Sequence, residues 1–144
     1  MSAMSEQSMN LMREIYEVIA SGDADRADEL LADDLIEHED QPPGSPQGRE
    51  GFKDFVRRIN AGFPDLECQI EDMTAEGDKV WARARLTGTH QGEFMGVPPT
   101  GNRVEFEVID IGRFENGKGV EHWGVSDAMA LMAQIGAIPS GAPG

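Results

Sequence analysis

Cysteine and long apolar runs are scarce in this sequence, and each scarcity excludes a class of protein. Cys68 is the one cysteine among 144 residues, which excludes an internal disulfide and a cluster of metal-binding thiolates. No apolar run approaches the length of a membrane span. The N-terminal residues are acidic and polar, whereas a secretory signal would be basic and then apolar. We therefore expect a soluble protein of the reducing cytoplasm.

Basic residues are also few. Lysine and arginine together number 12, against 27 aspartates and glutamates, which gives a formal net charge of −15. This charge repels nucleic acid and anionic membranes, and no cluster of basic residues offsets it. The three histidines lack the spacing of a metal site, and no phosphate-binding loop, nucleophile elbow or dinucleotide fingerprint is present. We therefore expect no metal, no cofactor, and neither nucleic acid nor a membrane as partner.

The apolar residues that are present recur first with a helical period and later with the alternation of strands. The helical pattern predicts helices over 5–21, a short segment after Asp23, 49–63 and 127–136. The alternation predicts strands over 66–71, 79–90, 103–114 and 118–125, with 33–40 a short strand or an extended turn. Helices followed by strands indicate an α+β fold. We expect a curved antiparallel sheet around three to four helices with an internal pocket, one domain over 1–138, and a flexible tail over 139–144.

The register of the last hairpin decides which residues share the pocket face. A two-residue turn at Asn116 and Gly117 would pair Glu115 with Lys118, whereas a three-residue loop would pair Phe114 with Lys118. Both registers are common. We favour the three-residue loop, because it gathers the valine and phenylalanine side chains of the two strands on one face. It also sends Glu105, Glu107 and Glu121 to the other face, where they can meet Arg83 and Arg85.

In the favoured register Asp110 lies opposite His122 on an otherwise apolar face. A buried carboxylate is costly unless it is hydrogen-bonded, and a cross-strand imidazole can supply that bond. Such a pair in a dry pocket can take a proton from carbon next to a carbonyl group and return it elsewhere. We therefore predict Asp110 and His122 as catalytic, with His90 at the end of the neighbouring strand as a second donor. The predicted pocket lining comprises His38, Phe94, Met95, Phe106, Val108, Gly124 and Met129.

Each of these residues also has a structural interpretation. The aspartate and histidine can form a structural pair, His90 can bond the loop backbone near Gly92, and His38 can lie on the surface. Asp127 is expected to cap the last helix. Trp81 and Trp123 fall on the outer face among charges, which is typical of a dimer surface.

Four segments give the chain a resemblance to a known family. They are Gly88–Phe94 (GTHQGEF), Gly96–Gly101 (GVPPTG), Glu121–Trp123 (EHW) and Gln134–Gly136 (QIG). Together they resemble the SnoaL-like polyketide cyclases of the nuclear transport factor 2-like superfamily, over nearly the whole chain. The resemblance implies a cone-shaped α+β barrel with an apolar cavity, a homodimer, and cofactor-free aldol ring closure.

Two positions depart from the cyclase pattern that the resemblance implies. The acid/base aspartate of the cyclases falls on Gly124 here, and their assisting histidine falls on Asp110. His122 and Asp127 match residues of the family. We therefore expect acid/base chemistry on an apolar carbonyl compound, as aldol closure or isomerisation, with the active pair moved by one strand position. The alternatives are a non-catalytic protein that binds a hydrophobic ligand, and an interaction domain that uses the tryptophan face.

Overall fold

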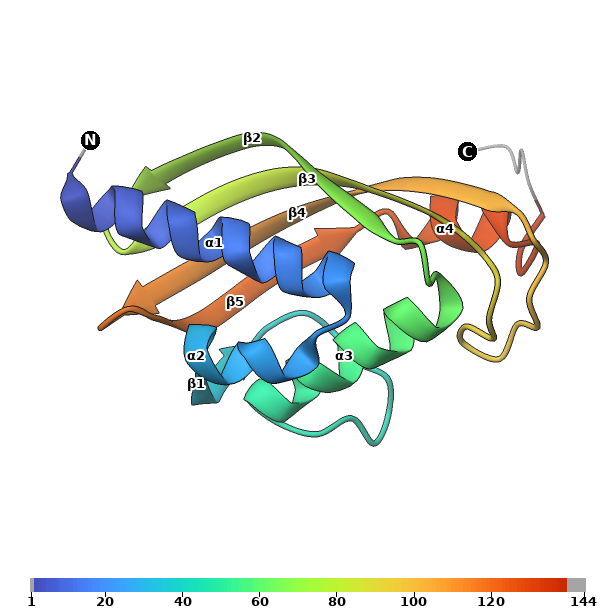
Figure 1. Cartoon of the computed structure of the whole chain (residues 1–144), viewed down its shortest axis with the longest axis horizontal. Coiled ribbons are helices and arrows are strands. Elements are labelled where there is room, and N and C mark those ends of the chain that lie inside the picture. The colour runs from blue at the N-terminus through green and yellow to red at the C-terminus, as the bar shows by residue number, and fades with distance from the viewer. Residues whose placement is uncertain (1, 140–144) are drawn as a thin grey trace.

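The computed structural model describes residues 2–139, and four helices and five strands make up the fold within them (Figure 1). The predicted tail lies outside the described residues apart from Pro139. The elements in chain order are α1 (Ala3–Ser21), α2 (Ala27–Leu30), β1 (Leu31–Glu37), α3 (Arg49–Gly62), β2 (Glu67–Glu76), β3 (Lys79–Thr89), β4 (Arg103–Glu115), β5 (Lys118–Ser126) and α4 (Ala128–Gln134). No helix among the described residues is both long and apolar enough to cross a membrane.

The ends of the long helices follow from their capping residues. α1 begins two residues earlier than predicted, because the Ser2 side chain accepts a hydrogen bond from the backbone N–H of Ser5 at 3.0 Å. It ends at Gly22, whose φ of 78° is the left-handed conformation that glycine adopts without strain. α3 ends at Gly62, one residue before the predicted end and before Pro64. The predicted helices of the first half are thus confirmed.

The short helical segment after Asp23 differs in detail from its prediction. It starts as a single 3₁₀ turn over Ala24–Arg26 and continues as α2. The preceding residue, Asp23, makes no capping hydrogen bond through its side chain. Ala27 and Leu30 are buried, so packing of these side chains holds the segment in place.

The sheet has the strand order β1-β5-β4-β3-β2 and curves over α1 and α3 (Figure 1). Four of its strands are antiparallel, as predicted. β1, the segment that the sequence left open between strand and turn, pairs in parallel with β5. The sheet is therefore mixed, and the prediction of a purely antiparallel sheet is wrong at this edge. β1 and β2 do not pair with each other, so the sheet stays open.

The favoured hairpin register between β4 and β5 is also wrong. Glu115 pairs with Lys118 across a two-residue turn, in which Asn116 and Gly117 both have positive φ, 51° and 76°. A bulge follows, and Val120 is its extra residue. The turn and the bulge each shift the pairing by one residue, in the same direction. Because the total shift is two residues, each side chain stays on its predicted face of the sheet.

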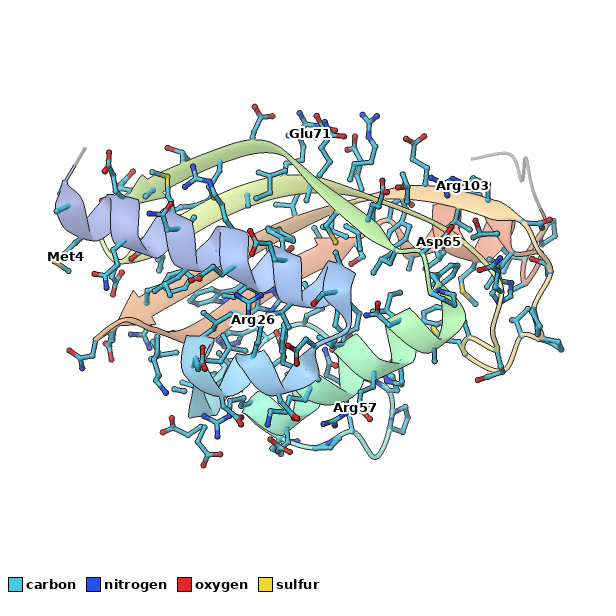
Figure 2. All side chains as sticks on the ribbon, in the orientation of Figure 1. Met4, Arg26, Arg57, Asp65, Glu71 and Arg103 are labelled. Carbon is cyan, nitrogen blue, oxygen red and sulfur yellow. The ribbon has the colours of Figure 1, made fainter. Side chains whose placement is uncertain are left out.

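The two faces of the sheet have the predicted character. The inner face carries buried apolar residues of β3 and β4, namely Val80, Ala82, Ala84, Leu86, Val104, Phe106, Val108 and Phe114. On the outer face Arg83 pairs with Glu107, and Arg85 with Glu105, each at 3.4 Å. Figure 2 shows Glu71 on this outer side, pointing away from the helices.

The last helix packs near the start of β4 and closes one side of the fold (Figure 1). The Oδ1 atom of Asp127 accepts a hydrogen bond from the backbone N–H of Ala130 at 3.1 Å, which confirms the predicted cap. Leu131 and Ile135 are buried against the core. The helix thereby brings apolar side chains to the space between the sheet and α3.

Candidate active site

A cavity of about 310 Å³ lies between the inner face of the sheet and the helices. Its walls are mainly apolar, and its polar residues gather where β1, β4 and β5 lie side by side. The apolar lining includes Met12, Ile15 and Ile19 of α1, Phe52, Phe55 and Ile59 of α3, Leu86, Phe106, Val108 and Phe114 of the sheet, Phe94 and Met95 of the following loop, and Leu131 and Met132 of α4. An apolar space with few convergent polar groups is typical of a small-molecule site.

Asp110 and His122 meet in this cavity. The Nε2 atom of His122 lies 2.8 Å from Oδ1 of Asp110. The two residues are not directly opposite, because Asp110 pairs with Gly124 and His122 pairs with Gly112. They are diagonal neighbours on one face, close enough for side chains to bond.

Two further residues extend the pair into a chain of hydrogen bonds. Tyr16, buried on α1, donates its hydroxyl to Oδ2 of Asp110 at 2.5 Å. On the other side, Nδ1 of His122 lies 2.5 Å from Oε2 of Glu37. The parallel pairing of β1 with β5 sets Glu37 beside His122. The resulting order is Tyr16, Asp110, His122 and Glu37.

Nearby charges and hydrogen bonds decide which of these four side chains carry a proton. Burial disfavours the imidazolium form of His122, but hydrogen bonds to Asp110 and Glu37 outweigh burial and raise the pKa of His122 to about 10. Burial and the nearby Asp110 also raise the pKa of Tyr16. At neutral pH, His122 is therefore a cation that donates to two carboxylates, and Tyr16 is a neutral donor. Asp110 accepts one hydrogen bond on each oxygen, and such bonds stabilise a carboxylate.

Glu39 stands beside this chain, two residues beyond Glu37. Its Oε2 atom accepts a hydrogen bond from the Ser126 hydroxyl at 3.3 Å. Burial raises the pKa of Glu39, and the negative charges of Asp110 and Glu37 add to that rise, whereas His122 and Ser126 oppose it. The site therefore contains three carboxyl groups, two of which are bonded to His122, whereas Glu39 is bonded to Ser126.

Gly124 leaves room for this cluster. A Cβ atom at position 124 would lie 2.7 Å from Oδ1 of Asp110, 2.7 Å from Oε1 of Glu39 and 2.8 Å from Cε1 of His122. Any side chain there would displace at least one of the three groups. The glycine thus marks the point on which the polar side chains converge.

The same three residues are the metal-binding candidates among residues 2–139. One atom each of Glu39, Asp110 and His122 lie within 4.8 Å of one another. Two carboxylates hold the imidazole in its charged form, in which both nitrogens carry hydrogen and offer no lone pair to a metal. At neutral pH the arrangement therefore suits proton transfer better than metal binding.

His90 lies elsewhere. Its side chain is 0% exposed, packs against Phe63 and does not line the cavity. Its Nδ1 atom accepts a hydrogen bond from the backbone N–H of Thr100 at 3.3 Å and lies 2.9 Å from the Thr100 hydroxyl. The structure thus places His90 as the residue that fastens the loop 91–102 to the end of β3, which was its structural interpretation.

The predicted lining residues divide into two groups. Phe94, Met95, Phe106 and Val108 line the cavity. His38 and Met129 do not: His38 is exposed, stacks on Trp123 at 4.9 Å and lies 2.6 Å from Glu121, and Met129 is 70% exposed. Gly124 borders the polar cluster without being part of the lining.

The sequence analysis missed Tyr16, Glu37 and Glu39. Tyr16 lies among the buried apolar residues of α1, and nothing in the sequence marks its hydroxyl as a partner of Asp110. Alternation from the buried Leu35 would have placed Glu37 and Glu39 on the same side of a strand, which is a usable signal. The parallel pairing of β1 with β5 brings these glutamates to His122, and the sequence around them does not indicate that pairing.

The comparisons with known proteins agree with this fold. Residues 9–135 match the sequence profile of the SnoaL-like polyketide cyclases. Aklanonic acid methyl ester cyclase from Streptomyces sp. (strain C5) is 30% identical over 141 residues, which cover 92% of this chain and 83% of that protein. Nogalonic acid methyl ester cyclase from Streptomyces nogalater is 28% identical over 118 residues, which cover 81% and 87%.

Solved structures show the same relationship in space. IdmH from Streptomyces antibioticus has a TM-score of 0.77 and 38% identity, over 90% of this chain and 99% of that chain. TsrD from Streptomyces laurentii has a TM-score of 0.83 and 29% identity, over 92% and 97%. With a profile match over most of its length, this chain belongs to the SnoaL-like polyketide cyclase family.

Proposed function

We propose that the protein is a cofactor-free acid/base enzyme that closes a ring by aldol addition, or isomerises, within an apolar carbonyl compound. The observation that carries the proposal is the contact of Asp110 with His122 at 2.8 Å inside an apolar cavity. A carboxylate that lines an apolar cavity is in a position to act as the base for a C–H group next to a carbonyl.

In the first step Asp110 takes a proton from the carbon next to a carbonyl group. The C–H bond breaks, its electron pair forms an enolate, and Asp110 becomes a carboxylic acid. The imidazole of His122 and the hydroxyl of Tyr16 lie on either side of Asp110 and hold its side chain in position before the step. The enolate carbon then attacks a second carbonyl carbon of the same molecule, which forms the ring bond.

A neutral substrate fits the charges of the site. Asp110 and Glu37 are negative and His122 is positive, so an additional carboxylate would enter against an excess of negative charge. The curated relatives are named for the methyl esters of aklanonic and nogalonic acid. We therefore propose a polyketide-type ester as the substrate class.

We propose further that the protein is a cytoplasmic homodimer that pairs through the outer face of its sheet. Ile109 and Val125 are cross-strand partners on that face and are 45% and 65% exposed. Trp81 and Trp123 are half-buried on the same face, so apolar area is available among the charges. Light scattering at micromolar concentration tests this arrangement, and a monomer would contradict it.

An assay in D₂O tests the enzymatic proposal. The protein is incubated with aklanonic acid methyl ester or nogalonic acid methyl ester, and both ring closure and deuterium uptake at the reacting carbon are followed. We expect activity in the wild type and none in Asp110→Asn, with the same thermal unfolding in both. Tight binding of the esters by both proteins, with neither product nor deuterium uptake, would favour the alternative of a non-catalytic ligand-binding protein.

A further inference from the structure

The base Asp110 leaves one requirement of the proposed reaction unmet. When the ring bond forms, the attacked carbonyl oxygen becomes an alkoxide and needs a proton. His90 is enclosed and His38 lies outside the cavity, so neither can supply it. Both ring nitrogens of His122 are already hydrogen-bonded to carboxylates. The proton donor must therefore be another group in the cavity.

Glu39 is placed to be that group. It lines the cavity, and its Oε1 atom lies 2.7 Å from the point that a Cβ of residue 124 would occupy. Oδ1 of Asp110 lies at the same distance from that point. Among residues 2–139 no hydrogen bond to Oε1 of Glu39 is formed, while its Oε2 atom is tied to Ser126. One oxygen of Glu39 is thus free and faces the space that Asp110 also faces.

The surroundings of Glu39 favour its protonated form. The charged groups near it are Glu37 on β1, Asp110 on β4 and His122 on β5. Burial and the two carboxylates raise the pKa of Glu39, against the opposing charge of His122. Arg58 of α3 lines the same cavity, but its Nε donates to Asp54 at 2.9 Å. Asp110, in contrast, has both oxygens occupied, one by the hydroxyl of Tyr16 and one by the imidazole of His122.

We propose that Glu39 is the second catalytic residue, the general acid that protonates the oxygen formed at ring closure. The inference rests on the proposed function. The O–H bond of Glu39 breaks as the alkoxide takes the proton and becomes a hydroxyl group, and Glu39 is left as a carboxylate. Asp110, which holds the proton taken from carbon, then returns it to Glu39. Atoms of both groups lie within 4.8 Å of one another, so one proton shift, direct or through one water, restores the starting state.

The test separates the two proton transfers. Glu39→Gln keeps the size of the side chain and removes its acidic proton, and Glu29→Gln, on the exposed face of α2, is the matched control. With the methyl ester substrates, we expect Glu39→Gln to retain deuterium uptake at the reacting carbon within about 3-fold and to lose ring closure by about 100-fold or more. The Glu29→Gln protein should match the wild type in both. Asp110→Asn should lose both activities.

Each other result has a definite meaning. Ring closure at the wild-type rate in Glu39→Gln overturns the role of Glu39, and so does an equal loss of both activities in that variant. Absence of both activities in the wild type overturns the proposed function itself. If Glu39→Gln unfolds, Glu39→Asp replaces it: partial ring closure with a fall in rate at high pH is expected, whereas no change in rate or pH profile counts against the general acid.

Discussion

His122 reaches Asp110 at 2.8 Å from a position that is diagonal, not opposite, because the Cα partner of Asp110 is Gly124. The two-residue turn and the bulge at Val120 together create this offset. A strand without the bulge would turn His122 to the outer face, since a shift of one residue reverses every side chain. The site therefore depends on an irregularity of β5 as much as on the residues themselves.

The paired imidazole predicts a pH dependence of stability. The folded-state pKa of His122 is about 10, above its ordinary value of 6.5. Because folding favours the protonated form, this contribution is fully present below pH 6.5 and is lost as the pH rises toward 10. We expect it to be on the order of a few kcal/mol in the free energy of unfolding.

Urea unfolding at pH 6, 8 and 10 measures this contribution, with His122→Gln as the reference. The wild type should lose more stability than the variant between pH 6 and pH 10. Parallel curves for the two proteins would show that the imidazole is not held as a cation by its two carboxylates.

Tyr16→Phe should weaken the site without changing its shape. The substitution removes the hydroxyl that donates to Oδ2 of Asp110 at 2.5 Å and leaves the buried ring. We expect kcat to fall by about 10-fold and the free energy of unfolding by roughly 1–3 kcal/mol, the range for a hydrogen bond to a charged group. Steady-state kinetics and thermal unfolding check both changes. An unchanged kcat would exclude the phenol from the proton-transfer machinery.

Gly124→Ala should damage the site while preserving the fold. Its Cβ would lie 2.7 Å from oxygens of both Asp110 and Glu39, so those side chains must move. The backbone at 124 is ordinary strand and accepts alanine. We expect a loss of kcat of about 10-fold or more from this misplacement.

Glu29→Ala serves as the control for that substitution, because Glu29 is exposed on α2, away from the cavity and from the outer face of the sheet. Activity should stay near the wild-type level in Glu29→Ala, and both variants should unfold at similar temperatures. Full activity in Gly124→Ala would mean that the convergence of the two carboxyl groups on this point has no part in the reaction.

The sequence predicted most of the fold because its helices and strands bury one face each. The positions of α1, α3, β3, β4, β5 and α4 follow from that periodicity to within two residues, and the pairing of Arg83 and Arg85 with glutamates follows from strand parity. The contact of Asp110 with His122 was also predicted, but from the wrong register. The turn and the bulge each shifted the pairing by one residue in the same direction, and a total shift of two residues leaves every side chain on its predicted face.

The other residues of the site could not be predicted from local sequence patterns. Tyr16, Glu37 and Glu39 reach Asp110 and His122 through contacts between distant parts of the chain, and α1 and the parallel strand β1 supply them. The presence of a histidine in the sequence is also a poor predictor of the site in this protein. Of the three, only His122 faces the cavity, because His90 satisfies a loop and His38 stacks on Trp123.

Charge in the cavity predicts discrimination between an ester and its free acid. Near the reacting space two carboxylates face one imidazolium, and the nearby Arg58 is already paired with Asp54 at 2.9 Å. A substrate carboxylate would therefore lose hydration without gaining a cation. We expect kcat/KM for aklanonic acid methyl ester to exceed that for the free acid by about 10-fold or more, mainly through KM. Steady-state kinetics at low and high salt measure the ratio of kcat/KM for the ester to kcat/KM for the acid. High salt screens repulsion between charges that solvent reaches, so this ratio should be smaller at high salt. Equal values for ester and acid would contradict the assignment of negative charge to the site.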